Sequence, residues 1–194
     1  LYLPENLLDI FIPILKRRIN SFMEYNGNYG LINSNSFKKT LTNINNLKRD
    51  TKNIDVLIDT AVEKTKTYHV SPFVVKCSDH NHSVFKQEYF APILAIYPYP
   101  TSKTKETLNL CSTANNYALT GSIFSTRENF IDHADKVLKS KTGNFYINCR
   151  STGSIVGNQP FGGSGKSGTN DKAGDMNILY RLFNQRNVKI NQTL

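Results

Sequence analysis

The amino-acid sequence predicts an α/β fold in which a mostly parallel sheet carries helices on both faces. Short apolar runs that suit buried strands alternate along the 194-residue chain with segments of helical periodicity. This alternation favours a parallel sheet, because parallel neighbours need crossover connections. The last well-defined apolar run leads into a glycine-rich stretch, and ligands in such folds bind beyond the carboxyl ends of strands.

In the N-terminal part, an amphipathic helix is predicted over residues 7–22. It is indicated by apolar residues at helical spacing, namely Leu7, Leu8, Phe11, Ile14, Leu15 and Ile19. Ser36 is a candidate N-cap for a polar helix that reaches residue 48. Strands follow at residues 54–58 and 70–75. Pro72 favours a sheet edge for the second strand, because proline donates no ladder hydrogen bond.

The remaining elements are inferred from short apolar runs and from helical spacing. Further strands are expected at residues 1–3, 93–97, 119–124 and 145–148, and further helices at residues 103–114, 127–139 and 176–183. Residues 187–190 alternate like an exposed strand with no obvious partner nearby.

Residues 144–174, which read NFYINCRSTGSIVGNQPFGGSGKSGTNDKAG, are too rich in glycine to be packed core. Glycine allows close backbone approach and positive φ, so N–H groups can converge on an anion. We expect a shaped loop around a ligand.

Two motifs in this chain resemble the aldehyde dehydrogenase superfamily. One is PFGGSGKSG, at 160–168, and the other is KQEYFAP, at 86–92, where Ala91 replaces the usual glycine. The run STGSIVGNQPFGG followed by SGTNDKAG is similar to one branch of that superfamily, the 1-pyrroline-5-carboxylate (L-glutamate γ-semialdehyde) dehydrogenases.

The resemblance implies that residues 1–184 form the second half of an aldehyde dehydrogenase catalytic domain and that residues 185–194 form an oligomerisation strand. The opening LYLP is similar to a strand that follows the nucleophilic cysteine in this family. The nucleophile, the general-base glutamate and the dinucleotide-binding domain are therefore expected upstream of Leu1. No catalytic residue is assigned to this chain, which is expected to be inactive alone.

The resemblance also implies supporting roles in binding NAD and substrate. Glu88 would accept hydrogen bonds from the nicotinamide ribose hydroxyls, and Phe90 would pack beside the nicotinamide. Gly153 and Ser154 would hold the substrate α-carboxylate, and Phe161 would pack on its aliphatic part. From the residue types alone, solvated side chains, turn-forming hydroxyls and core aromatics remain alternatives.

The implied activity is NAD-dependent oxidation of L-glutamate γ-semialdehyde to L-glutamate in proline degradation. The implied setting is the mitochondrial matrix, and the implied assembly is a homodimer or higher homo-oligomer. A non-catalytic fragment that acts as an oligomerisation or interaction module is the alternative. A start codon at this boundary would support the alternative, and a longer transcript with an upstream cysteine would support the enzyme.

Composition argues against nucleic-acid and membrane partners. The net charge of +9 comes from lysines and arginines that form only sparse clusters, without the interleaved aromatics of a nucleic-acid motif. No apolar run approaches the roughly 20 residues that span a bilayer. The cysteines Cys77, Cys111 and Cys149 have no metal-ligand spacing, so no metal site is predicted. We interpret Cys149, beside the glycine-rich stretch, as a non-catalytic thiol.

Overall fold

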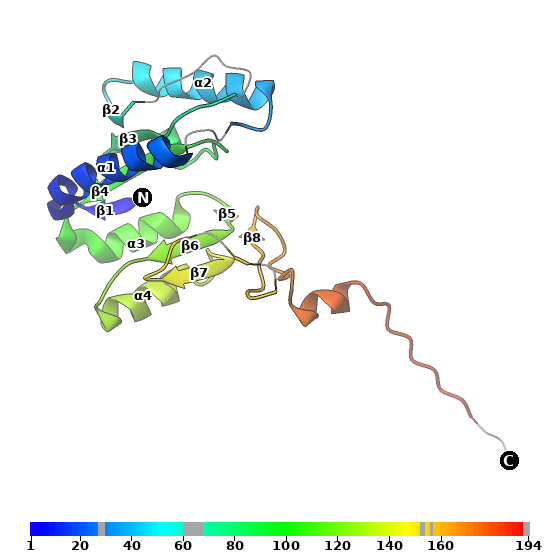
Figure 1. Ribbon diagram of the computed structural model, residues 1–194. Coiled ribbons are helices and arrows are strands. Elements are labelled where there is room, and N and C mark those ends of the chain that lie inside the picture. The colour runs from blue at the N-terminus through cyan, green and yellow to red at the C-terminus, as the bar shows by residue number, and fades with distance from the viewer. Residues whose placement is uncertain (27–29, 60–67, 152–153, 156, 192–194) are drawn as a thin grey trace. The chain divides into compact units, whose positions relative to one another are not determined.

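The computed structural model describes residues 1–26, 30–59, 68–151, 154–155 and 157–191. The chain divides into two compact units, Leu1–Asn115 and Asn116–Leu194 (Figure 1). Each unit has its own β-structure.

The first unit is built on a four-stranded sheet with the order β1-β4-β3-β2. Strands β1 (Tyr2–Pro4), β4 (Ile93–Tyr99) and β3 (Phe73–Cys77) are parallel to one another, and β2 (Ile54–Ile58) pairs antiparallel with β3. The predicted mostly parallel sheet is therefore confirmed, with one antiparallel strand at its edge.

Helices cover both faces of this sheet, as predicted (Figure 1). Helix α2 (Ser34–Arg49) packs Ile44 and Leu47 into the cluster that contains Phe73 and Val75. Helix α1 (Leu8–Asn26), which follows a 3-10 turn η1 (Glu5–Leu7), packs against Val74 and its neighbours. Successive strand residues point to opposite faces, so the apolar residues Phe73, Val74 and Val75 of β3 can contact helices on both faces.

Two local predictions in this unit were wrong. Strand β3 is central rather than at an edge, because Pro72 precedes the strand and the first ladder donor is the Phe73 N–H, which bonds Pro92 O at 2.8 Å. The N-cap of α2 is Asn33 rather than Ser36, since the Asn33 side chain accepts from the Ser36 N–H at 2.9 Å. After β4, a 3-10 turn η3 (Thr101–Lys103) leads into α3 (Thr104–Thr113).

The second unit contains a parallel pair, β6 (Thr120–Ile123) and β7 (Asn144–Ile147), joined through helix α4 (Glu128–Leu138). The strand predicted at residues 119–124 is β6, which begins one residue later because Leu119 separates it from a short preceding strand. The preceding β5 (Tyr117–Ala118) pairs instead with β8 (Ser164–Gly165), which lies inside the glycine-rich stretch and was not predicted.

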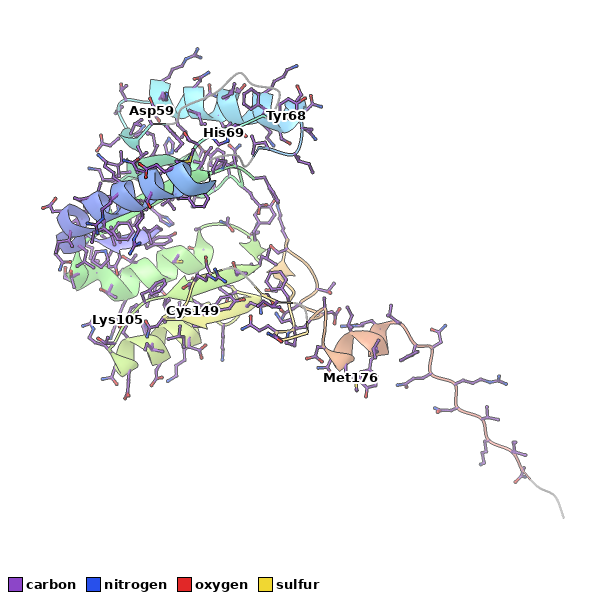
Figure 2. The ribbon with its side chains drawn as sticks, viewed as in Figure 1. Asp59, Tyr68, His69, Lys105, Cys149 and Met176 are labelled. Atoms are coloured by element: carbon purple, nitrogen blue, oxygen red, sulfur yellow. The ribbon has the colours of Figure 1, made fainter. Side chains whose placement is uncertain are left out.

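The C-terminal part differs from prediction. Residues predicted as a helix at 176–183 form the 3-10 element η4 (Met176–Arg181), beginning at the labelled Met176 (Figure 2). Residues 187–190 are not a strand. An extended segment needs a neighbouring strand to satisfy its backbone groups, and these residues form no ladder within the described chain.

Candidate functional site

Glu88 and Phe90 lie in a short loop between the 3-10 element η2 (Ser83–Phe85) and β4. Backbone hydrogen bonds hold both ends of this loop. The Gln87 N–H donates to Ser83 O at 3.0 Å, and Pro92 O accepts from β3. Tyr89 is half-buried against the core cluster, and this burial raises the pKa of its hydroxyl. Because Tyr89 packs inward, its two neighbours are left to solvent.

Phe90 is the unusual residue of this loop. Its side chain is 84% exposed and its backbone φ is +50°, a left-handed conformation that bulky residues rarely adopt. Such outliers persist only where the surrounding structure holds them, and they concentrate at ligand sites. Glu88 is also exposed, so its carboxylate is open to hydrogen-bond donors. The pair lies at the amino ends of β3 and β4, not at the carboxyl ends where ligands of parallel sheets usually bind.

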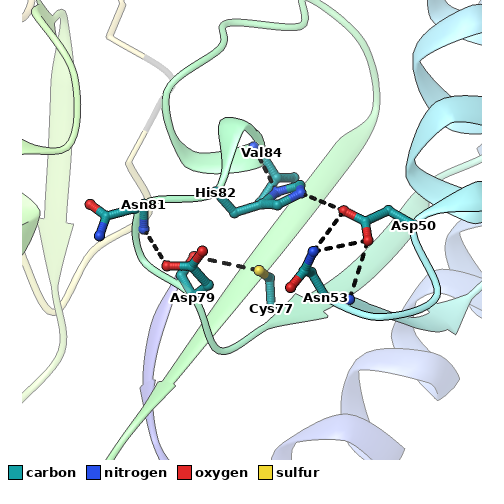
Figure 3. A network of polar contacts seen from close by, with 7 residues as sticks. All are labelled: Asp50, Asn53, Cys77, Asp79, Asn81, His82 and Val84. Carbon is teal, nitrogen blue, oxygen red and sulfur yellow. Dashed lines mark hydrogen bonds and ion pairs between the residues drawn. The ribbon is translucent and has the colours of Figure 1, made fainter.

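A polar network steadies η2 just before this loop (Figure 3). His82 Nδ1 accepts from the Val84 N–H at 3.1 Å, so His82 Nε2 carries the hydrogen that bonds Asp50 Oδ2 at 2.9 Å. Hydrogen bonds from Asn53 and then from His82 lower the pKa of Asp50. The network connects the end of α2 to the turn that leads into Glu88.

In the second unit, Asn148 ends β7 with a backbone φ of +53°. Its side-chain oxygen accepts from the Ser125 N–H at 2.8 Å, and its amide donates to Ser125 O at 2.9 Å. The next residue, Cys149, is exposed (Figure 2), and Cys149 O accepts from the Ser122 hydroxyl at 2.5 Å. The chain then continues into residues 150–161, called the anchoring loop, which include the predicted substrate residues Gly153, Ser154 and Phe161.

Two of the predicted substrate residues make separate hydrogen bonds in this part of the chain. Ser154 is half-buried and its hydroxyl donates to Gln159 O at 3.2 Å. Phe161 is half-buried and shares two 2.9 Å backbone hydrogen bonds with Ala173. Gly153 lies outside the described residues.

Several glycines of this stretch allow close backbone packing. A Cβ at Gly162 would collide with Asp171 O, and one at Gly163 would lie 2.6 Å from Ser167 Cβ. Gly143, just before β7, would likewise collide with Gly162 O. By contrast, Gly157 has a φ of +87° and open space around it, as expected for a turn.

Sequence reasoning missed three residues that hold these loops in place: Tyr89, Asn148 and Lys172. Tyr89 and Asn148 occur at ordinary loop positions with no distinguishing pattern. Lys172 stands in the run SGTNDKAG, which contributed to the family resemblance but indicated no role for the lysine. Its contacts are made with residues remote in sequence, such as Gly143.

Other reactive groups are arranged for structure rather than for chemistry. Burial raises the pKa of the Cys77 thiol, as it does that of Cys111, so both favour the protonated, unreactive form. In the described part of the chain, no three or more histidine, cysteine or acidic side chains gather as metal ligands would. None of the helices in that same part combines the length and apolarity needed to cross a membrane.

The fold and its loops define the class of protein. The model of the aldehyde dehydrogenase family matches residues 2–188, and the chain belongs to that family. More particularly, it is 41% identical over 161 residues to the mitochondrial delta-1-pyrroline-5-carboxylate dehydrogenase of Dictyostelium discoideum, an alignment that covers 83% of this chain and 29% of that protein.

Solved structures agree with this placement. The delta-pyrroline-5-carboxylate dehydrogenase of Mycobacterium tuberculosis is 30% identical with a TM-score of 0.80, covering 93% of this chain and 34% of that one. A structure of that enzyme bound with NAD is 34% identical with a TM-score of 0.68, covering 78% and 27% of the two chains. The resemblance predicted from the motifs is confirmed, and the chain spans about a third or less of these relatives.

Proposed function

We propose that this chain is part of a complete enzyme that oxidises L-glutamate γ-semialdehyde to L-glutamate with NAD in proline degradation. The observation that carries the proposal is the conformation of Phe90, exposed and left-handed beside an exposed Glu88. The choice of substrate is supported by the relatives, which are named delta-1-pyrroline-5-carboxylate dehydrogenases.

Toward NAD, this chain would contribute Glu88 and Phe90. An ionised carboxylate has only acceptor capacity, so Glu88 suits a pair of ribose hydroxyls. Phe90 offers an aromatic face beside the nicotinamide ring, whose chemistry when bound is to accept a hydride. The inward packing of Tyr89 supports this assignment, because it fixes both neighbours without using them in the core.

Toward the substrate, this chain would contribute Gly153, Ser154 and Phe161. The Ser154 hydroxyl now bonds loop backbone at Gln159 O, and a carboxylate oxygen would compete for the same donor hydrogen. Phe161 would cover the aliphatic part of the semialdehyde. Fixing a group remote from the aldehyde orients the reacting carbon, which lowers the entropic barrier of the reaction.

The complete enzyme is further proposed to be a homodimer or higher homo-oligomer of the mitochondrial matrix. The compartment is supported by the Dictyostelium relative, whose name includes the word mitochondrial. Oligomer formation is supported by exposed apolar side chains near the C-terminus, namely Met176, Tyr180, Leu182, Phe183, Val188 and Ile190.

The test is NADH production from glutamate γ-semialdehyde by the complete enzyme and its Glu88→Gln variant. A hydrogen bond to a charged acceptor contributes about 1.5–3 kcal/mol of interaction free energy. Loss of the charge in Glu88→Gln should therefore lower kcat/KM for NAD roughly 10- to 100-fold. Glu128→Gln, on an exposed position of α4, is the matched control and should leave these kinetics unchanged. Absence of NADH from the semialdehyde would refute the proposed activity, and unchanged NAD kinetics in Glu88→Gln would refute the role of Glu88.

A further inference from the structure

We propose that Lys172 is a positioning residue whose ammonium group holds the backbone around Phe161 in place for substrate binding. The proposal rests on the proposed function, since it concerns how the substrate residue Phe161 is held. Lys172 is half-buried within the second unit.

The ammonium group of Lys172 is surrounded by neutral oxygen acceptors. It donates to Gly143 O at 2.5 Å, to Gly162 O at 2.6 Å and to the Asn170 side-chain oxygen at 2.7 Å. Asn144 Oδ1 lies farther away, at 3.4 Å. An ammonium has three N–H donors, and the three short contacts give each of them one acceptor. Because all three donors bond to protein oxygens, the Lys172 ammonium differs from that of a solvated surface lysine.

These acceptors come from segments that approach one another too closely for side chains to intervene. A Cβ on Gly143 would collide with Gly162 O, and one on Gly162 with Asp171 O. The carbonyl oxygens of Gly143 and Gly162 therefore point toward the same position. Both oxygens carry partial negative charge, so they repel each other unless a hydrogen-bond donor lies between them. The Lys172 ammonium is that donor, and without it both carbonyls would lose a hydrogen bond.

The same contacts fix the position of Phe161. Lys172 binds Gly162 O, while the next residue, Ala173, exchanges two backbone hydrogen bonds with Phe161. From the other side, the Asn144 amide donates to Pro160 O at 3.0 Å, and Asn144 Oδ1 accepts from the Gly162 N–H at 3.3 Å. Residues 160–162 are thus fastened between the start of β7 and the Lys172 segment. Loss of the ammonium would free one side of this attachment.

Asn170 is adapted to the same task. Its φ of +65° is a left-handed conformation that asparagine tolerates better than most residues, and its N–H donates to Gly163 O at 2.7 Å. This turn carries the Asn170 side chain back onto Lys172. Burial lowers the pKa of Lys172.

The experiment uses the complete enzyme with Lys172→Met, which keeps an unbranched side chain of similar length and removes the donors. We expect KM for glutamate γ-semialdehyde and Kd for L-glutamate, measured by calorimetry, to rise roughly 10- to 100-fold. Because the contact acts on the substrate loop, kcat and KM for NAD should change by less than about threefold. Lys166→Met, at an exposed lysine of the same stretch, is the matched control and should match wild type.

Asn170→Gly keeps the proposal testable if Lys172→Met fails to fold. Glycine accepts the left-handed backbone, so this variant removes a single acceptor and should raise KM for the semialdehyde about two- to fivefold. A parallel loss of kcat, NAD affinity and glutamate affinity, or no change in glutamate affinity, would overturn the positioning role. If wild-type enzyme makes no NADH from the semialdehyde, the proposed function fails instead.

Discussion

Two left-handed residues stand beside the predicted binding segments, Phe90 in the NAD segment and Asn148 before the anchoring loop, with φ of +50° and +53°. They are stabilised in different ways. Asn148 gains two side-chain hydrogen bonds to the Ser125 backbone, whereas Phe90 is held by the packing of Tyr89 and by the bond from Phe73 to Pro92 O. At the residue scale, the conformations of both loops are therefore set by contacts with neighbouring residues.

Asp50 makes a residue-scale contribution to stability that depends on pH. Its pKa in the folded protein is lowered by hydrogen bonds from Asn53 and His82, so it stabilises the fold above its unfolded pKa of about 4. That contribution is lost as the pH falls through the lowered pKa. We expect Asp50→Asn to lower the urea midpoint of the complete enzyme at pH 7, with the difference from wild type narrowing below about pH 4. A difference that stays constant down to pH 3 would contradict this account.

At the scale of elements, β3 and α2 determine where the Glu88 loop lies. Val75 and Cys77 of β3 face the cluster that holds α2, and the Asp50–His82 contact at the end of α2 fixes η2 (Figure 3). A change in the stability of α2 should therefore reach the Glu88 loop through η2. In the second unit, β6 and β7 play the corresponding part for the anchoring loop.

The start of α2 offers a direct test at this scale. The Asn33 side chain satisfies the Ser36 N–H, so Asn33→Ala should destabilise the protein by about 1 kcal/mol. Ser36→Ala leaves that bond intact and should change stability by less than about 0.5 kcal/mol. Urea unfolding of both variants measures the difference. A larger loss in Ser36→Ala than in Asn33→Ala would restore Ser36 as the cap.

At the scale of the whole molecule, apolar side chains that the described chain does not cover stand out. Ile10 on α1 is 64% exposed, and Phe183 beyond η4 is 66% exposed. The division into a catalytic part at residues 1–184 and an oligomerisation tail at residues 185–194 stays a prediction.

Oligomer formation can be tested through the last apolar residues. Val188 and Ile190 alternate with Lys189, so a strand formed on assembly would bury the first two on one face. We expect Val188→Asp to weaken assembly of the complete enzyme, seen as a lower mass in sedimentation equilibrium. Lys189→Asp introduces the same side chain on the other face and should leave the mass unchanged. Equal masses for wild type and Val188→Asp would argue against a role for this segment.

The sequence by itself determined the family of the chain and the order of most of its helices and strands. The periodicity that predicted α1 and the apolar runs of β2 and β7 are local signals, and local signals survive in a single sequence. The motifs around Glu88 and Phe161 are local as well. For this reason, the fold class and the resemblance could be predicted without a structure.

Tertiary structure alone decided which elements meet. The central position of β3, the pairing of β5 with β8 and the contacts of Lys172 depend on residues far apart in sequence, such as Lys172 and Gly143, separated by 29 positions. Residues 187–190 alternate as a strand would, yet they form no strand, because the described chain supplies no partner strand for them. The pattern of side chains determines which secondary structure a segment can adopt. Whether the segment adopts that structure depends on the hydrogen-bond partners that the tertiary fold places beside it.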